Sequence, residues 1–309
     1  MKPLAITLGD PAGIGAEVVF KALEQTEVPV WLFGNRAYAS ASGDIPKRAK
    51  FVDTGEASGS LQFGQIDAGY GRIALQSIDR ALQAIEDGSC SALVTAPIHK
   101  QAIAAAGSPF PGHTELLAAR AGLKRYGVDY AMYFDAPSFR AVLHTVHVPL
   151  AAAIKAITAD SILALARLTA REHLRLHGTP PRIAVAAVNP HAGEGGAFGD
   201  DEAIIAAGIA RAREESIDVS GPYPADTLFR DAREGKYDVV MAMYHDQALI
   251  PIKTVDFHRA VNVTIGLPYL RCSVDHGTAF DIAGRGIADP EPMRYAIEWA
   301  ARHWDGFSR

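Results

Sequence analysis

The stretch RIAVAAVNPHAGEGG, residues 182–196, sets a short apolar run directly against a loop that holds a proline, a histidine and three glycines. The apolar run, residues 182–188, predicts a buried strand. Helical periodicity precedes it at residues 161–176 and follows it at residues 201–215. Strand and helix alternate in this way along most of the chain. That alternation predicts an α/β fold with a largely parallel or mixed sheet.

The other expected elements follow the same pattern of short apolar runs and amphipathic segments. Strands are expected at residues 4–8, 30–33, 92–95, 130–134, 139–146 and 239–243, and helices at 17–23, 76–86, 114–121 and 292–303. Neither a low-complexity linker nor a repeat marks a domain boundary. The loosest segment is residues 40–71, which is rich in Gly, Ser and Asp.

The composition is that of a globular enzyme, with 49% hydrophobic and 21% charged residues in a chain of 309. A net charge of −5 and the lack of a basic tract argue against a nucleic-acid-binding protein. Two cysteines, Cys90 and Cys272, fit a reducing compartment. Gly9, Asp10 and Pro11 interrupt the N-terminal segment before a signal-peptide core can form, and no apolar run approaches the ~20 residues of a membrane span. We therefore expect a cytoplasmic protein without a membrane or nucleic-acid partner.

The common nucleotide-binding motifs are missing or weak. Residues 69–74 fit GxGxxA, but they follow no convincing strand, so a dinucleotide fingerprint is not expected there. Gly235 and Lys236 are followed by Tyr237, which excludes a P-loop at that point. The sequence predicts neither a Rossmann nor a Walker site.

Three histidines share one setting, because His147, His191 and His245 each follow an apolar strand and precede loop-forming residues. In α/β sheets, ligands bind beyond the carboxyl ends of the strands. Three imidazoles gathered there would hold a divalent metal and leave coordination positions open for substrate. The alternative is that each histidine is a strand-end residue bonded to a backbone carbonyl, and spacing alone does not decide between the two.

Two further groups could bind an anion. His113 and Thr114 stand at an expected helix start, where backbone N–H groups attract negative charge, although Thr114 could instead be only the N-cap. Residues 245–285 are dense in polar groups beside glycines and include Lys253 and Arg271. A Lys and Arg pair suits a phosphate or carboxylate, and the alternative is a solvated loop with incidental charges.

Taken in order, seven blocks form a series: residues 9–17, 95–97, 112–115, 189–195, 224–227, 243–247 and 273–278. The series resembles the 4-hydroxythreonine-4-phosphate dehydrogenase (PdxA) family of vitamin B6 synthesis over nearly the whole chain. The blocks NPHAGEG and MYHDQ are its most specific parts.

The resemblance implies a two-domain fold like that of the isocitrate and isopropylmalate dehydrogenases, with mixed sheets, flanking helices and NAD bound without a Rossmann fingerprint. The first domain is expected at residues 1–125 plus 266–309. The second, at residues 126–265, is expected to carry much of the metal site. The family also implies a homodimer with the metal site at the subunit interface.

The resemblance assigns roles to residues. The expected metal ligands are His147, His191 and His245, for zinc, magnesium or cobalt, contributed across the dimer. The expected substrate-binding residues are His113, Thr114, Lys253, Asn262 and Arg271. Lys253 is the first candidate for proton transfer, with Asp226 and Asp246 as bases or as residues that orient a ligand histidine. Contacts to NAD or NADP are expected from Asn189, Gly193, Gly195 and Asp275.

The implied activity is metal-dependent oxidation, by NAD(P), of the secondary alcohol of 4-phosphohydroxy-L-threonine. The β-keto acid formed would decarboxylate to 3-amino-2-oxopropyl phosphate. Relatives with other substrates leave two alternatives, D-threonate or D-erythronate 4-phosphate and an aromatic cis-dihydrodiol, and the compressed segment 40–71 keeps the choice open. From other classes come a three-histidine hydrolase or lyase that uses no nucleotide, and a catalytically silent binding protein.

Overall fold

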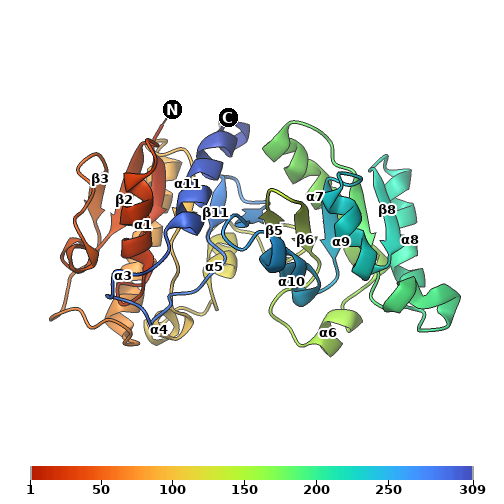
Figure 1. Ribbon diagram of the computed structural model, residues 1–309, viewed down its shortest axis with the longest axis horizontal. Helices are drawn as coiled ribbons and strands as arrows, with labels where there is room; N and C mark the ends of the chain where they lie inside the picture. Colours follow the sequence, from red (N-terminus) through yellow and green to blue (C-terminus); the bar gives the residue numbers. More distant parts are fainter. Residues whose placement is uncertain (1, 308–309) are drawn as a thin grey trace. The chain divides into compact units, whose positions relative to one another are not determined.

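The structure is a computed structural model that describes residues 2–307, so the ends of the predicted first domain, residues 1 and 308–309, lie outside the described part. The chain forms two units (Figure 1). Unit 1 is Met1–Ala121 together with Leu267–Arg309, and unit 2 is Gly122–Gly266. Each unit is a sheet with flanking helices, which confirms the predicted α/β fold.

Unit 1 has a parallel sheet in which β1 lies between β2 and β4. Its strands in spatial order are β3 (Lys50–Asp53), β2 (Val30–Gly34), β1 (Leu4–Thr7), β4 (Leu93–Thr95) and β11 (Arg271–Ser273). Its helices are α1 (Gly15–Glu24), α2 (Arg36–Ala39), α3 (Ala68–Glu86), α4 (Lys100–Ala105), α5 (His113–Arg120) and α11 (Glu291–His303), with 3-10 turns η1 (Ser40–Ser42) and η3 (Trp304–Phe307). Strand β1 is buried along its whole length because helices cover both faces.

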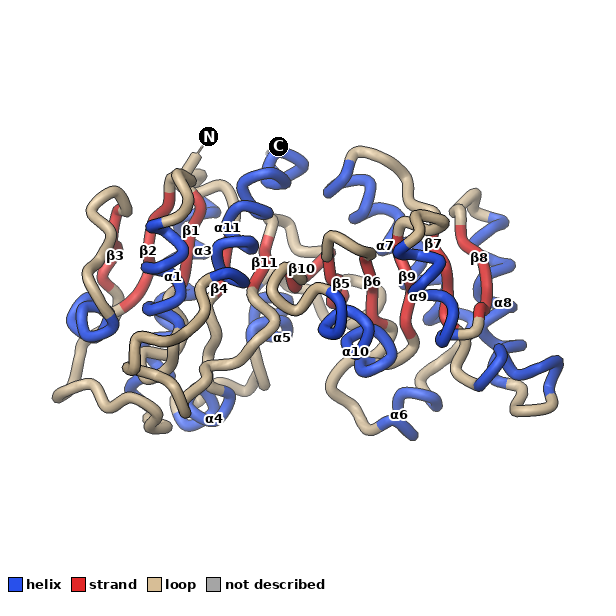
Figure 2. The backbone as a smooth tube through the Cα atoms, in the orientation of Figure 1, coloured by secondary structure: helices blue, strands red, loops and turns tan. Residues whose placement is uncertain are grey.

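Unit 2 has a mixed sheet, in which β5 pairs antiparallel with β10 and β6 while the remaining pairs are parallel (Figure 2). Its strands in spatial order are β10 (Val261–Ile265), β5 (Ala131–Asp135), β6 (Arg140–Leu143), β9 (Val239–Ala242), β7 (Ile183–Ala186) and β8 (Val219–Tyr223). Its helices are α6 (Leu150–Lys155), α7 (Ala159–His177), α8 (Asp201–Glu214), α9 (Ala225–Arg233) and α10 (His245–Val255), with the 3-10 segment η2 (Pro190–Gly196). Helices α9 and α10 pack over the apolar face formed by β5, β6, β9 and β7.

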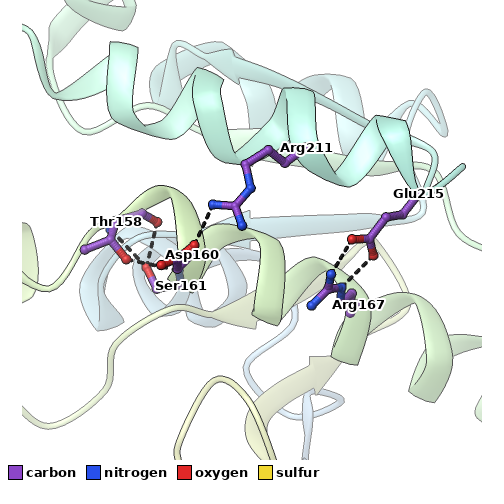
Figure 3. Close-up of polar contacts among 6 residues, drawn as sticks. All are labelled: Thr158, Asp160, Ser161, Arg167, Arg211 and Glu215. Atoms are coloured by element: carbon purple, nitrogen blue, oxygen red, sulfur yellow. Dashed lines mark hydrogen bonds and ion pairs between the residues drawn. The ribbon is translucent and has the colours of Figure 1, made fainter.

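The pairing of α7 with α8 shows how sequence sets local structure in unit 2 (Figure 3). Thr158 caps α7 in a reciprocal capping box with Ser161. Asp160 lies in the first turn and pairs with Arg211 of α8. These helices approach closely at Gly208, where an added Cβ would lie 2.6 Å from the Cβ of Ile162.

The GxGxxA match at residues 69–74 lies within the first turns of α3. The second glycine, Gly71, has a packing role: a Cβ there would lie 2.1 Å from the carbonyl oxygen of Ala102 in α4. This glycine therefore lets two helix backbones touch. Among residues 2–307, no helix is long and apolar enough to cross a membrane.

Candidate metal and substrate site

Two of the three predicted metal ligands lie together at one edge of the unit 2 sheet. Strands β6 and β9 are parallel neighbours with Leu143 opposite Ala242, so their carboxyl ends meet. His147 follows β6 by four residues and His245 begins α10 directly after β9. The centroids of the two imidazole rings are 5.7 Å apart, and both side chains line a cavity of about 240 Å³.

The carboxylate of Asp246 determines which ring nitrogen of His245 is left available to a metal. Its Oδ1 lies 2.7 Å from Nδ1 of His245. A carboxylate at Nδ1 holds a proton there and leaves the lone pair of Nε2 for a metal. Asp246 is therefore placed to orient this histidine.

His191, the third predicted ligand, lies on an exposed loop after β7, the strand on the other side of β9. Residues 191–195 all have positive φ, and His191 itself has φ 51°. Its Nδ1 lies 3.2 Å from Oε2 of Glu194. Within residues 2–307, the three histidines do not bring their ligand atoms within 4.8 Å of one another. One chain thus gathers two of the predicted ligands and leaves the third apart.

A buried carboxylate organises the loop that carries His191. Oε1 of Glu202, on α8, accepts hydrogen bonds from the backbone N–H groups of Val188 and Asn189, at 3.1 and 2.7 Å. Its Oε2 accepts one from the side-chain amide of Asn189, at 3.0 Å. A Cβ on Gly193 would lie 2.7 Å from the same oxygen. Asn189 and Gly193, expected as cofactor contacts, thus have structural roles in this loop, whereas a Cβ on Gly195 would meet no atom within 4 Å.

The remaining predicted residues of unit 2 lie on three elements. Asp226 is exposed in the first turn of α9, a helix that also contacts η2. Lys253 is half-buried in the last turn of α10. Asn262 is half-buried on β10, and its Oδ1 is shielded from solvent without a hydrogen-bond partner in the described part of the chain. An orphaned buried oxygen of this kind favours a ligand that brings a donor.

Unit 1 holds the rest of the predicted substrate residues; the backbone of Arg271 lies at the amino end of β11, opposite Leu93, and its side chain reaches Thr95 at the carboxyl end of β4. Arg271 begins β11, is only 2% exposed, and donates from Nη2 to Oγ1 of Thr95 at 2.7 Å. Helix α5 begins at His113 after Gly112, so the buried Thr114 is not its N-cap and that alternative is wrong. Asp275 follows β11 by two residues.

Burial sets the charge of these unit 1 residues. Desolvation lowers the pKa of Arg271 to about 10, so the guanidinium remains charged at neutral pH. Desolvation, reinforced by the charge of Arg271, holds the pKa of His113 well below its usual value, so this imidazole is neutral. Nε2 of His113 is shielded and has no partner among residues 2–307. A charged Arg and an unsatisfied imidazole in a dry setting have the chemistry to hold an anion, and we call Arg271 and His113 with the adjoining Thr114 the anion seat.

Two polar residues that received no role from the sequence lie at the carboxyl ends of β1 and β4. Asp10 follows β1, is 1% exposed, and accepts a hydrogen bond from the backbone N–H of Ala12. Desolvation raises the pKa of its carboxyl to about 6. Thr95, at the end of β4, is fully buried against Arg271. Both residues lie in the sequence blocks 9–17 and 95–97. The sequence places them at strand ends, but that position alone does not reveal which side chain or backbone group each one bonds to.

The two units, each an α/β sheet with polar groups at strand ends, form a two-domain α/β fold. A solved β-decarboxylating dehydrogenase from Thermococcus kodakarensis shares the fold, with a TM-score of 0.53 and 16% identity over 99% of this chain and 85% of that one. The predicted isocitrate and isopropylmalate dehydrogenase-like class is thereby confirmed. Residues 8–300 match the family described as pyridoxal phosphate biosynthetic protein PdxA, and the chain belongs to this family.

Relatives agree with that assignment. A 4-hydroxythreonine-4-phosphate dehydrogenase from Beijerinckia indica is 44% identical over 97% of this chain and 94% of the relative. The crystal structure of the Klebsiella pneumoniae protein of the same name has a TM-score of 0.86 and 37% identity, covering 97% of this chain and 99% of that one. A terephthalate 1,2-cis-dihydrodiol dehydrogenase from Burkholderia xenovorans has a TM-score of 0.66 and 30% identity, covering 97% and 98%.

Proposed function

We propose that this protein is a metal-dependent, NAD(P)-linked dehydrogenase that oxidises the secondary alcohol of 4-phosphohydroxy-L-threonine. The β-keto acid then loses CO₂ to give 3-amino-2-oxopropyl phosphate, a step of pyridoxal phosphate synthesis. The observation that carries the proposal is the pairing of His147 with His245 at the edge of unit 2, in a chain whose relatives bear this enzyme's name.

The donor set fits a divalent cation. Two imidazoles that share one zinc ion, with Zn–N of about 2.1 Å, have ring centroids roughly 5 Å apart, close to the 5.7 Å between His147 and His245. Asp246 fixes the proton of His245 on Nδ1. When bound, zinc, magnesium or cobalt would lower the pKa of the substrate hydroxyl and NAD(P)⁺ would accept the hydride.

The chain's own residues bind and orient the substrate in this proposal. Arg271, His113 and Thr114 hold the phosphate, because a buried guanidinium with neutral donors beside it favours a compact anion. Asn262 and Lys253 hold the carboxylate end. The half-buried Lys253 takes the hydroxyl proton, with the exposed Asp226 as the second candidate, while Asp246 orients His245. Asn189, Gly193, Gly195 and Asp275 would contact NAD(P), and Asn189 and Gly193 also hold their own loop in shape.

A second copy of the chain completes the site. One chain pairs only two of the three predicted ligands. Beside that pair, Val148 and Leu150 are 49% and 53% exposed. Large exposed apolar side chains that lie together favour burial against another protein surface. We therefore propose a homodimer in which a partner subunit supplies the missing ligand.

The anion seat recognises charge but does not identify the substrate's carbon skeleton. D-threonate or D-erythronate 4-phosphate would carry the same phosphate, and the likeness to a terephthalate dihydrodiol dehydrogenase keeps a dihydrodiol as a second candidate. Two buried free thiols, Cys90 and Cys272, support a cytoplasmic location.

The deciding experiment follows NADH formation by absorbance with each of these substrates, with and without EDTA. We expect EDTA-sensitive turnover of 4-phosphohydroxythreonine and little with the others. A His245→Ala variant should lose both bound metal and turnover. Turnover only with a sugar-acid phosphate would move the enzyme to another substrate, and EDTA-resistant turnover would refute the metal site.

A further inference from the structure

A buried hydroxyl joins the two segments of unit 2 that carry His147 and His245. These segments leave the sheet from the neighbouring strands β6 and β9. Just beyond the strands, Oγ1 of Thr145 donates a hydrogen bond to the carbonyl oxygen of Met243, at 2.8 Å. Thr145 stands two residues before His147, and Met243 stands two residues before His245. This hydrogen bond therefore fixes the two segments to each other close to the histidines.

The side-chain amide of Gln247 connects the same peptide to a third strand. Gln247 lies in the first turn of α10, and its Oε1 accepts a hydrogen bond from the backbone N–H of Met243 at 2.7 Å. Its Nε2 donates to the carbonyl oxygen of Ala187, also at 2.7 Å. Ala187 directly follows β7, the strand that leads to the loop of His191. One side chain thus connects the carboxyl ends of β9 and β7.

The same series of contacts continues into the loop of His191. Beyond β7, two successive backbone N–H groups of this loop donate to Oε1 of Glu202. The segments that lead to all three predicted ligands are thus connected by hydrogen bonds to side chains. The side chains of Thr145, Gln247 and Glu202 are all buried, with at most 9% exposed. Water is therefore poorly placed to replace any of them, and the loss of one leaves a buried backbone group unsatisfied.

These hydrogen bonds are important because strand pairing does not extend to the histidines. Residues 145–149 form neither helix nor strand, so the hydroxyl of Thr145 supplies a link to β9 that the sheet does not. The ligands of a tight metal site must be held to within roughly 0.5 Å of the productive geometry. The separation of 5.7 Å between the rings of His147 and His245 therefore depends on contacts of this kind.

From these observations we propose that Thr145 and Gln247 are positioning residues for the divalent metal. Thr145 holds the segment of His147 against that of His245, and Gln247 holds both against the end of β7. Both residues act through the backbone of Met243. The inference rests on the proposed function, because it concerns the metal that His147 and His245 would bind. A role in folding alone would lower stability and leave the affinity for metal unchanged, so the two roles can be separated.

The test measures zinc affinity of the full-length protein by chelator competition, and stability by urea unfolding. Thr145→Val keeps the volume but removes the hydroxyl, and it should weaken zinc binding about tenfold, the lower end for residues that orient ligands. Thr145→Ser keeps the hydroxyl and should bind zinc within about twofold of the unmodified protein. Gln247→Met leaves two backbone groups unbonded and should weaken zinc binding by about tenfold or more.

Thr169→Val is the matched control. Thr169 is fully buried in α7, and its Oγ1 donates to the backbone carbonyl oxygen of Leu165 at 2.7 Å, so the same substitution removes the same kind of hydrogen bond. The valine variants at 145 and 169 should lower the urea midpoint by similar amounts, but only the first should weaken zinc binding. With cobalt as the bound metal, the visible absorption bands should shift in Thr145→Val and not in Thr169→Val, because they report ligand geometry.

Two results would overturn the positioning role while leaving the metal site in place. One is that Thr145→Val binds zinc as tightly as Thr169→Val, although His245→Ala binds it weakly. The other is an equal loss of zinc affinity in both valine variants, which would reflect a general loosening of the fold. If His245→Ala binds zinc like the unmodified protein, the proposed metal site itself fails and the positioning role fails with it.

Discussion

Replacing Thr95 with valine should damage the anion seat while leaving its shape intact. Valine has nearly the volume of threonine but cannot accept the 2.7 Å hydrogen bond from Nη2 of Arg271. Both residues are buried, at 0% and 2% exposure, so water cannot replace the lost partner. A hydrogen bond to a charged group contributes about 1.5–3 kcal/mol, and an unsatisfied buried donor loses that amount.

Loss of this hydrogen bond should lower both the free energy of unfolding and the affinity for phosphate. The free energy of unfolding of Thr95→Val should fall by about 1.5–3 kcal/mol. A guanidinium that is no longer held in one direction should also bind a phosphate about tenfold more weakly, which corresponds to ~1.4 kcal/mol. The neutral hydroxyl matters here, since a carboxylate partner would hold Arg271 equally well but would cancel the charge that attracts the anion.

The assay combines urea unfolding with calorimetric titration of inorganic phosphate and with KM and kcat for the proposed substrate. KM should rise about tenfold with kcat within about twofold, because the lost contact positions a binding group. Thr95→Ser keeps the hydroxyl and should recover most of the affinity. If valine and serine variants bind phosphate equally well, the hydrogen bond does not position Arg271 and the reasoning is refuted.

Three further predictions follow from other contacts. Asp246→Ala removes the partner of His245 Nδ1 and should weaken zinc binding about 10–100-fold in chelator competition; unchanged affinity would contradict the orienting role. Gly71→Ala places a methyl group against α4 and should lower the free energy of unfolding by about 1–3 kcal/mol with unchanged NAD(P) affinity, whereas the reverse pattern would restore residues 69–74 as a nucleotide loop. Burial lowers the pKa of His144 to about 4, so its stabilising contribution is complete above pH ~6.5 and is lost as pH falls toward 4. His144→Gln should therefore flatten the pH dependence of unfolding across that window by up to about 3 kcal/mol; parallel profiles would contradict the shift.

Apolar runs and helical periodicity were sufficient to predict the class of fold, because most strands here are buried on both faces. Strand β3 was not predicted, because it is not a buried apolar run. Lys50 and Asp53 make it a half-exposed edge strand inside a polar segment. The expected strand at residues 139–146 ends at Leu143, since the chain beyond it turns to form the loop that carries His147. Short-range patterns indicate that an element exists better than they indicate where it ends.

The candidate site likewise has one part that local sequence patterns could predict and one part that they could not. His147 and His245 could be expected together because each follows a strand, and the strands prove to be neighbours. The hydrogen bond between Arg271 and Thr95 could not be expected from the sequence, because it depends on the register of β11 against β4 across a separation of 176 residues. A threonine at a strand end has the same local sequence signal whether or not an arginine reaches it.

The loop of His191 shows why neighbouring strands alone do not complete the site. His191 and Glu194 hold positive φ values, which are strained for residues with a side chain and persist only where the surroundings fix them. Glu202 does this from α8, by three hydrogen bonds to Val188 and Asn189. The direction of the His191 imidazole thus depends on a carboxylate that does not contact it. The affinity of the proposed site for a metal should accordingly be sensitive to Glu202, a dependence that strand order cannot reveal.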